Sequence, residues 1–410
     1  MDNLCQCGVA ARSQKTRQYL LEYNMKKILF KTIFVMAALL TAGITATAET
    51  YIEQDSITRN KQDFAYLVAY TEANYAAFPA IMQAGYAAPY QAMKDSFGLK
   101  ISTGEWGIRQ AACEYVYWFN AQFDAHFYVD EHLFWQVYKR RDTPDYKQLM
   151  NYAPQAVSQR VNKKTWLLRI PSCAGQNPTN EWVSQAVETF LQSGCKHLII
   201  DLRGNSGGSD EIWMPLLPLL IDHQAAVPET YWFRNTHANR YHPAMQDWAL
   251  AIISDHDNPA PSFLQVGADE GDDDEDEAIP AHDARIHISF IIDRKTASSA
   301  ETILRVAQNY TDRERYTIYG KENSAGAAET GNLFPFHLPN SRIQVFYPNT
   351  VSSLFLHDGH PSKASGIAPD VRIELPYPDT LTDNIDSWVS DIAKRPNYDS
   401  PNPLKEGAHR

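Results

Sequence analysis

The chain has 410 residues, of which 44% are hydrophobic and 12% aromatic, so it can build a sizeable core and is not a disordered chain. Residues 1–48 hold six of its 37 Lys and Arg and two of its 49 Asp and Glu, which leaves 31 against 47 and a net charge of −16 in residues 49–410. A surface of that sign repels phosphate backbones, and no basic stripe is evident. The composition therefore argues against a nucleic-acid-binding protein.

The first 48 residues predict an export signal. Met25-Lys26-Lys27 precedes an apolar run, Ile28–Leu40, and Ala46-Thr47-Ala48 follows it. This order is that of a secretory signal peptide, and its clean apolar stretch, Ile33–Ala42, is too short to span a membrane comfortably. We expect residues 1–24 to be a non-native leader and residues 25–48 a cleaved signal peptide. The mature protein is then periplasmic or secreted, with no stable membrane anchor.

Residues 49–140 are predicted to form an N-terminal helical region. An apolar stripe of roughly helical period, expected to end at Pro79, consists of Phe64, Leu67, Val68, Tyr75 and Phe78. Ser102-x-x-Glu105 is a capping-box signal that would open another helix, running through Cys113. Residues 140–163 are polar and are interpreted as a connector.

From Thr165 onward strands and helices alternate, which indicates an α/β layered core over residues 165–376. One helix is predicted after a cap at Thr179 or Asn180, with its C-terminal stop at Gly194. Residues 377–410 would add a C-terminal helix and tail. The expected strands are Trp166–Ile170, His197–Leu202, Arg285–Ile292, Tyr316–Tyr319, Ile343–Tyr347 and Val371–Leu375.

An irregular acidic insertion is expected at about residues 234–284. Asp269–Glu277 has eight acids in nine positions, but it lacks the ligand alternation and closing Glu of an EF-hand, so a solvated loop is favoured over a calcium site. Outside the leader the cysteines are Cys113, Cys173 and Cys195. Cys173 and Cys195 could form one bridge in an oxidising compartment, and three buried thiols are the alternative.

Two turns that follow predicted strands could carry chemistry. Asp201–Gly208 reads Asp-Leu-Arg-Gly-Asn-Ser-Gly-Gly, and its glycines would let backbone N–H groups face a phosphate or an oxyanion. The alternative is a tight turn that Asp201 and Arg203 merely pin. Thr296–Glu301 would expose a hydroxyl at a helix N-terminus, as a nucleophile elbow does, unless its serines are only helix caps.

A third segment, Phe123–Phe127, contains His126 at the end of the helical region. A serine hydroxyl is a poor nucleophile unless a base accepts its proton, and histidine is the commonest base. The alternative interpretation is a histidine packed among aromatic side chains.

In this order the segments resemble those of the S41 family of serine peptidases, the tail-specific or C-terminal-processing proteases. The similarity runs from Asp63 to Ile392. Leu198–Gly208 looks like the family's strand and Asp-Leu-Arg-x-Asn-x-Gly-Gly turn, and Thr296–Glu301 looks like its nucleophile segment. Further matching landmarks are Trp166–Pro171, Gly320–Gly326, Leu338–Ser341 and Gly366–Asp370. The resemblance implies an α/β, ClpP/crotonase-like layered core with an N-terminal helical region.

The chain departs from the processing proteases at their base. They carry a Lys in a Gly-Lys-Gly segment, whereas the matching Ser324–Ala327 has none and Lys321 aligns with a non-catalytic position. Asp124-Ala125-His126 is similar to the Asp-x-His context of the tricorn-core-like branch. The 75 positions between His126 and Asp201 are too few for the usual PDZ domain of about ninety residues.

The resemblance implies an exported serine endopeptidase that acts on polypeptides and needs no metal or organic cofactor. Ser298 would be the nucleophile and His126 its general base. The N–H groups of Ser299 and of Gly207 or Gly208 would form the oxyanion hole. Asp358 and Glu374 are candidates for the acid that orients His126. The alternative is a catalytically inactive binding protein on the S41 fold, and the sequence does not reveal the oligomeric state.

Overall fold

The computed structural model describes residues 48–130, 152–175, 177–224, 229–245, 262–266, 286–357, 360–361 and 366–395. The chain divides into Met1–Ser56 and a larger compact unit, Ile57–Arg410, which carries every candidate site residue. The leader, the signal segment up to residue 47, the acidic run Asp269–Glu277 and Asp358 lie outside the described residues. Within the described residues, no helix is both long and apolar enough to cross a membrane.

A six-stranded sheet forms the centre of the α/β core. Its strand order is β13-β8-β7-β4-β3-β2, and all neighbours run parallel except β2, which is antiparallel to β3. The strands are β2 (Val157–Arg160), β3 (Thr165–Arg169), β4 (His197–Asp201), β7 (His287–Ile292), β8 (Tyr316–Gly320) and β13 (Val371–Arg372). The predicted α/β class is confirmed.

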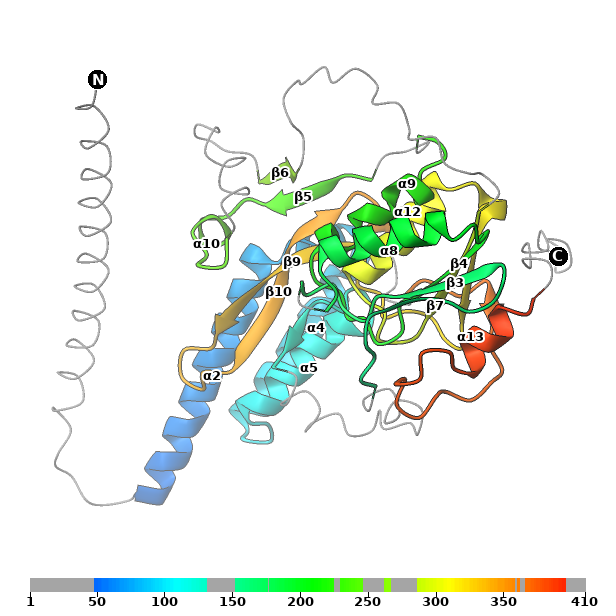
Figure 1. Cartoon of the computed structure of the whole chain (residues 1–410). Coiled ribbons are helices and arrows are strands. Elements are labelled where there is room, and N and C mark those ends of the chain that lie inside the picture. Colours follow the sequence, from blue (N-terminus) through cyan, green and yellow to red (C-terminus); the bar gives the residue numbers. More distant parts are fainter. Residues whose placement is uncertain are drawn as a thin grey trace, which may run out of the picture. The chain divides into compact units, whose positions relative to one another are not determined.

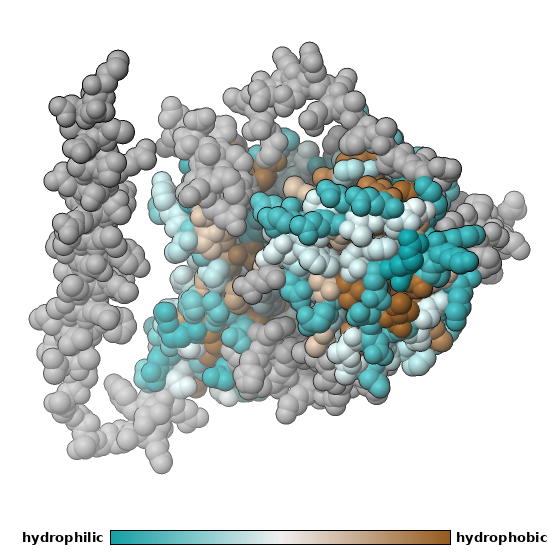
Figure 2. All heavy atoms as spheres, in the orientation of Figure 1, coloured by the Kyte–Doolittle hydropathy of each residue, from teal (hydrophilic) through white to brown (hydrophobic). Residues whose placement is uncertain are grey.

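Both faces of this sheet are covered, which explains why its strands read as continuous apolar runs. Leu198 and Ile200 of β4 pack in the cluster that includes α8 (Asn180–Gln192), α9 (Leu217–Leu220) and α12 (Ser299–Tyr310). Ile199, between them, packs with Trp388 of α13 (Ser387–Ile392) on the opposite face. Figure 1 shows α8 and α12 on one side of the strands and α13 on the other. In Figure 2 mainly hydrophilic residues lie over the first of these faces.

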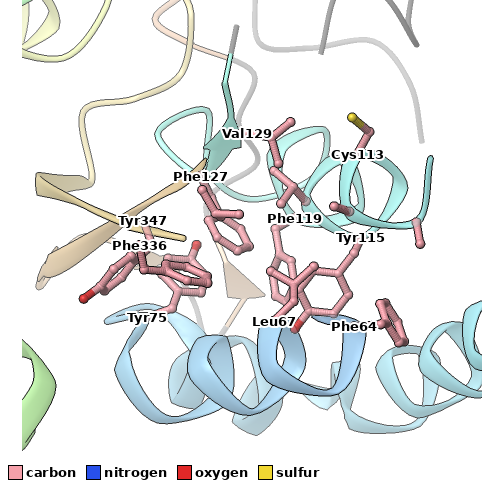
Figure 3. Close-up of a cluster of buried hydrophobic side chains, with 14 of the residues drawn as sticks. Phe64, Leu67, Tyr75, Cys113, Tyr115, Phe119, Phe127, Val129, Phe336 and Tyr347 are labelled. Atoms are coloured by element: carbon pink, nitrogen blue, oxygen red, sulfur yellow. The ribbon is translucent and has the colours of Figure 1, made fainter. Parts of the chain in front are cut away.

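A second sheet packs against the N-terminal helices. Its main path is β1-β10-β5-β6, and β9 pairs along β10. Phe336 of β9 and Tyr347 of β10 share one hydrophobic cluster with Phe64 of α2 and Phe119 of α5 (Figure 3). The elements are α2 (Ala48–Asn74), α4 (Ala87–Ser102), α5 (Ile108–Asn120), β1 (Tyr128–Val129), β5 (Tyr231–Arg234), β6 (Phe263–Val266), β9 (Thr330–His337) and β10 (Gln344–Ser352).

Short elements complete the described chain. They are α3 (Phe78–Ile81), η1 (Met82–Tyr86), η3 (Asp210–Ile212), η4 (Met214–Leu216), α10 (His237–Arg240), η5 (Arg313–Arg315), β11 (Leu356–His357) and β12 (His360–Pro361). Because β5, α10 and β6 fall within or at the edge of residues 234–284, the expected irregular insertion contains regular structure.

Two predicted helix boundaries are wrong. Pro79 does not end the first helix, since α2 stops at Asn74 and Pro79 lies in the first turn of α3, where its missing N–H costs nothing. Ser102 does not open a helix, because it is the last residue of α4 and its hydroxyl donates to the carbonyl of Gly98. The helix through Cys113 begins at Ile108 instead.

Two other expectations about the core are settled. Thr179, and not Asn180, caps α8, because its hydroxyl accepts the Trp182 N–H. Cys113, Cys173 and Cys195 are buried thiols, so the thiol interpretation holds and no Cys173–Cys195 bridge is present.

Candidate active site

Ser298 lies in a tight turn between β7 and α12. Its backbone has φ 54° and ψ −125°, a combination that residues other than glycine rarely adopt. On one side of it, Ala297 N–H donates to the carbonyl of Asn205 at 3.0 Å. On the other side, Ser298 N–H itself donates to Glu301 Oε2 at 3.1 Å. A strained strand-to-helix turn of this kind presents a serine hydroxyl where a nucleophile elbow presents one.

The carboxylate of Glu301 ties this turn to the segment 324–327. It is completely buried and accepts hydrogen bonds from the N–H groups of Gly326 at 2.9 Å and Ala327 at 2.7 Å. The Ser324 hydroxyl donates to it as well. Burial raises the pKa of Glu301 above its ordinary value, although its hydrogen-bond donors oppose that shift. One side chain thus fixes segment 324–327 against the serine turn.

The Asp201-Leu202-Arg203 motif pins the loop that follows β4. Arg203 donates to Asp201 at 2.7 Å and to Asp386 at 2.6 Å. Arg169 of β3 donates to Asp201 at 2.8 Å. Burial alone would raise the pKa of Asp201, but the charges of Arg203 and Arg169 lower it below its ordinary value. The pairing of Asp201 with Arg203 is therefore present and fixes the base of the loop.

The glycines at the end of this loop lie against the serine turn. Gly207 has φ 97°, and a Cβ added there would lie 2.6 Å from Ser298 Cβ and 2.9 Å from the carbonyl oxygen of Ala297. Gly208 has φ 137°, and a Cβ there would lie 2.1 Å from the carbonyl oxygen of Cys173. Both positions require glycine, because neither the backbone angle nor the space admits a side chain.

The N–H groups of the two glycines differ in availability. Gly207 N–H donates to Asn205 Oδ1 at 2.9 Å, so of the two expected donors Gly207 is already engaged within the loop. Within the described part of the chain, the N–H groups of Gly208 and Ser299 have no hydrogen-bond acceptor. An oxyanion hole requires N–H groups that are free to donate to the negative charge that develops on the substrate.

His126 reaches this region from the N-terminal half of the chain. It follows α5, and the neighbouring Ala125 N–H donates to the carbonyl of Gly326 at 3.3 Å. Its side chain is buried, and Nδ1 lies 3.1 Å from Thr330 Oγ1. Burial lowers the pKa of His126 below 6.5, against the opposing effect of the Asp124 charge. The imidazole is therefore neutral at neutral pH and can accept a proton.

Ser298 and His126 both border the segment 324–330, one through Glu301 and the other through Gly326 and Thr330. Among the described residues no hydrogen bond joins Ser298 Oγ to the imidazole, and in free enzymes such bonds are often long. Sequence positions 172 residues apart are thus connected to one short stretch of chain.

The other residues considered from the sequence lie elsewhere. Lys321 Nζ is 5.2 Å from the ring centroid of Tyr377, which packs on the α13 side of the sheet. Glu374 is exposed beyond β13, and nothing in the described residues bonds it to His126. The carboxylate that contacts His126 is that of Asp124, which accepts a hydrogen bond from the backbone N–H of His126 at 2.9 Å.

Three contributors to the site were not assigned from the sequence. Asp124 and Glu301 stand within the quoted motifs, two residues before His126 and three after Ser298, so their position in those motifs was an available signal. The sequence offered no such signal for Thr330, because it is 204 residues from the histidine that it contacts.

The site is built from the loops that follow the carboxyl ends of the parallel strands β4, β7 and β8. This edge of the sheet is where α/β enzymes bind their ligands. The fold and the site thus define an α/β enzyme class. The model of peptidase family S41 matches residues 164–373, and the chain belongs to this family. It is therefore a peptidase, a hydrolase with polypeptide substrates. No curated protein sequence matches the chain.

Several solved structures are similar to the chain. A candidate peptidase from Parabacteroides merdae has a TM-score of 0.48 at 15% identity, over 77% of this chain and 89% of that one. Mature CPAF complexed with lactacystin has a TM-score of 0.46 at 13% identity, over 77% of this chain and 93% of that one. The photosystem II D1 C-terminal processing protease has a TM-score of 0.31 at 15% identity, over 54% of this chain and 46% of that one.

Proposed function

We propose that the chain is a serine endopeptidase in which Ser298 is the nucleophile and His126 the general base. The observation that carries the proposal is the backbone of Ser298, strained at φ 54° in a strand-to-helix turn and packed against Gly207. A capping serine needs no such conformation, because an ordinary N-cap residue has extended φ and ψ. Strain of this kind is retained where a reactive group must be presented.

In the proposed reaction His126 removes the Ser298 proton while Oγ attacks the peptide carbonyl carbon. The carbonyl oxygen becomes an oxyanion, which the N–H groups of Gly208 and Ser299 stabilise. The C–N bond then breaks as His126 returns its proton to the leaving amine. Water, deprotonated by the same histidine, hydrolyses the acyl-enzyme and frees Ser298.

Hydrolysis of a denatured protein such as casein tests this function. We expect the wild-type chain to release fragments with new internal termini, as an endopeptidase does, and Ser298→Ala to release none above background. Lys321→Ala is the matched control and should cleave normally, since that ammonium lies against Tyr377. A folded wild-type chain without hydrolysis would favour the inactive binding protein, and activity lost in Lys321→Ala would transfer the base role to Lys321.

We also propose that the protein is exported, with cleavage after Ala48. The support is the sequence of basic residues, apolar run and Ala-Thr-Ala site at Met25–Ala48. N-terminal sequencing of periplasmic or secreted material should return Glu49 first. Recovery of an intact Met1 terminus from that material would contradict the proposal.

A further inference from the structure

The hydrogen bonds behind His126 determine which of its nitrogens carries a proton. Nδ1 faces Thr330 Oγ1 at 3.1 Å, and a neutral imidazole has one nitrogen that donates and one that accepts. A histidine can act as base toward a serine only through the nitrogen without a proton. The direction of the His126–Thr330 hydrogen bond therefore decides whether Nε2 is free to do this.

The second partner of Thr330 sets that direction. The Thr330 hydroxyl lies 2.7 Å from Asp124 Oδ1, and an ionised carboxylate can only accept. The single hydroxyl proton must therefore point to Asp124, which leaves the Thr330 oxygen as an acceptor for His126. Nδ1 must then be the protonated nitrogen.

Asp124 is a buried acceptor of several hydrogen bonds. It accepts hydrogen bonds from the Tyr75 hydroxyl at 2.7 Å and from the backbone N–H of His126 at 2.9 Å, besides the one from the Thr330 hydroxyl. Three donors thus converge on one buried carboxyl, which accepts in each of these hydrogen bonds. Tyr75 directly follows α2, and Thr330 begins β9, so the arrangement joins three separate parts of the chain.

Other charges near this group are already paired. Glu329, beside Thr330, forms an ion pair with Arg305 of α12. Glu301 is occupied by the serine turn and segment 324–327. Asp124 is the charge that acts on His126, and it raises the imidazole pKa against the effect of burial.

We propose that Thr330 and Asp124 are positioning residues that hold His126 in its Nδ1–H tautomer and leave Nε2 as the base. The inference rests on the proposed function for its catalytic consequence, but the tautomer itself does not depend on activity. Thr330 thereby couples the imidazole to a carboxylate that does not touch the ring nitrogens. When His126 is protonated during the reaction, the charge of Asp124 stabilises the imidazolium through this hydroxyl.

The first measurement is the tautomer of His126, read from the ¹⁵N shifts of the imidazole in the full chain at neutral pH. Wild type should show Nδ1 protonated and Nε2 unprotonated. Thr330→Val keeps the shape of the side chain but removes the hydroxyl, and it should lose this preference, whereas Thr330→Ser should keep it. Nε2 protonated in wild type would overturn the proposal, even if Thr330→Val failed to fold.

The second measurement is the pH dependence of peptide hydrolysis. Thr330→Val should lower kcat by about a hundredfold with KM little changed, since wrong tautomers cost general-base catalysis that much or more. Its acid limb should move to lower pH, because the hydroxyl oxygen that accepts from Nδ1, and so favours the imidazolium, is gone. The backbone of residue 330, which also raises the pKa of His126, is kept in this variant. Thr330→Ser should restore kcat to within a few-fold and restore the acid limb.

Thr350→Val is the matched control, because Thr350 is a buried threonine of neighbouring β10 whose hydroxyl bonds to Asn332. It should have normal kcat and a normal acid limb. Active wild type with an essential His126, together with a fully active Thr330→Val, would overturn the positioning role alone. A folded but inactive wild type with the predicted tautomer would instead contradict the proposed function.

Discussion

The two halves of the candidate site are built in different ways. The half that carries Ser298 comes from turns after neighbouring parallel strands, and its glycine loop and serine turn contact each other directly. The half that carries His126 depends on Tyr75, which follows α2, and on β9 and segment 324–327, all of them far away in the sequence. The first half consists of two local turns that neighbouring strands bring together, and the second depends on packing between several separate elements.

This difference predicts different sensitivities. Changes in the serine half should alter a rigid geometry and remove activity at every pH. Changes in the histidine half should alter protonation, and their effect should depend on pH. The following variants test that distinction, from the largest expected effect to the smallest.

His126→Ala should lower kcat by about 10⁴-fold or more while KM changes little, because the base acts in the transition state and not in substrate binding. The residual rate should lose the acid limb that His126 imposes. Steady-state kinetics between pH 5 and 9 checks both expectations. Loss of activity that appeared only in KM would contradict a role for His126 as base.

Gly208→Ala should reduce kcat by about 10²–10³-fold at all pH values, since removing one oxyanion donor has that effect. The added Cβ would lie 2.1 Å from the Cys173 carbonyl oxygen, so the loop must move. Gly104→Ala is the control, because Gly104 also has positive φ, at 73°, but its Cβ would meet only Ile57 Cδ1 at 3.7 Å. Equal activity of the two variants would mean that the loop is only a turn.

Glu301→Gln should lower the free energy of unfolding by roughly 1–3 kcal/mol, because an amide nitrogen cannot accept a hydrogen bond and must face a buried donor. The shift of segment 324–327 should also lower kcat by about tenfold, the order expected from slight misplacement of the site. Chemical denaturation and kinetics measure the two effects. Glu188→Gln on the exposed face of α8 should leave both unchanged.

The smallest effect concerns stability at acidic pH, away from the site. His197 and His287 are buried on adjacent parallel strands, and burial lowers their pKa values from 6.5 to about 3 and about 4. Below pH 6.5 the unfolded chain takes up protons that the folded chain does not, so these groups make stability fall as pH decreases toward 4. The loss is at most roughly 2 kcal/mol per histidine near pH 5, since one pKa unit corresponds to about 1.4 kcal/mol.

Melting temperatures of wild type and His287→Gln between pH 7 and 4.5 measure this contribution. The variant should lose less stability over that range, because one of the two groups no longer titrates. Identical pH dependence would contradict the assignment. Peptide hydrolysis by the variant at neutral pH should remain normal.

The parallel sheet and its turns were predictable because each strand is a short apolar run followed by a recognisable turn. The serine turn and the glycine loop were therefore identified from the sequence. Which of Gly207 and Gly208 has an N–H group without an acceptor could not be predicted, since it depends on where the Asn205 side chain points. Most of the second sheet was not predicted. β9 contains Pro335, which argues against a strand, and it is accommodated because β9 pairs only with β10 among the described strands.

Asp124 was not among the acids considered, for a related reason. Asp358 and Glu374 were considered because the resemblance places an acid near the end of the core. Asp124 stood inside the histidine motif, but its contact with the imidazole runs through Thr330, and no local pattern connects that residue to position 126. The expected boundary at Pro79 failed because a proline is equally suited to the first turn of a new helix, here α3. The expected boundary at Ser102 failed because its capping pattern falls at the end of α4.

The central claim is that Ser298 is a nucleophile activated by His126, and covalent labelling with a fluorophosphonate tests it most directly. Mass spectrometry of the digested adduct should place one phosphonyl group on Ser298. Labelling should be absent in Ser298→Ala and strongly slowed in His126→Ala. A folded wild-type chain that is not labelled at Ser298, or His126→Ala labelled as fast as wild type, would contradict the account.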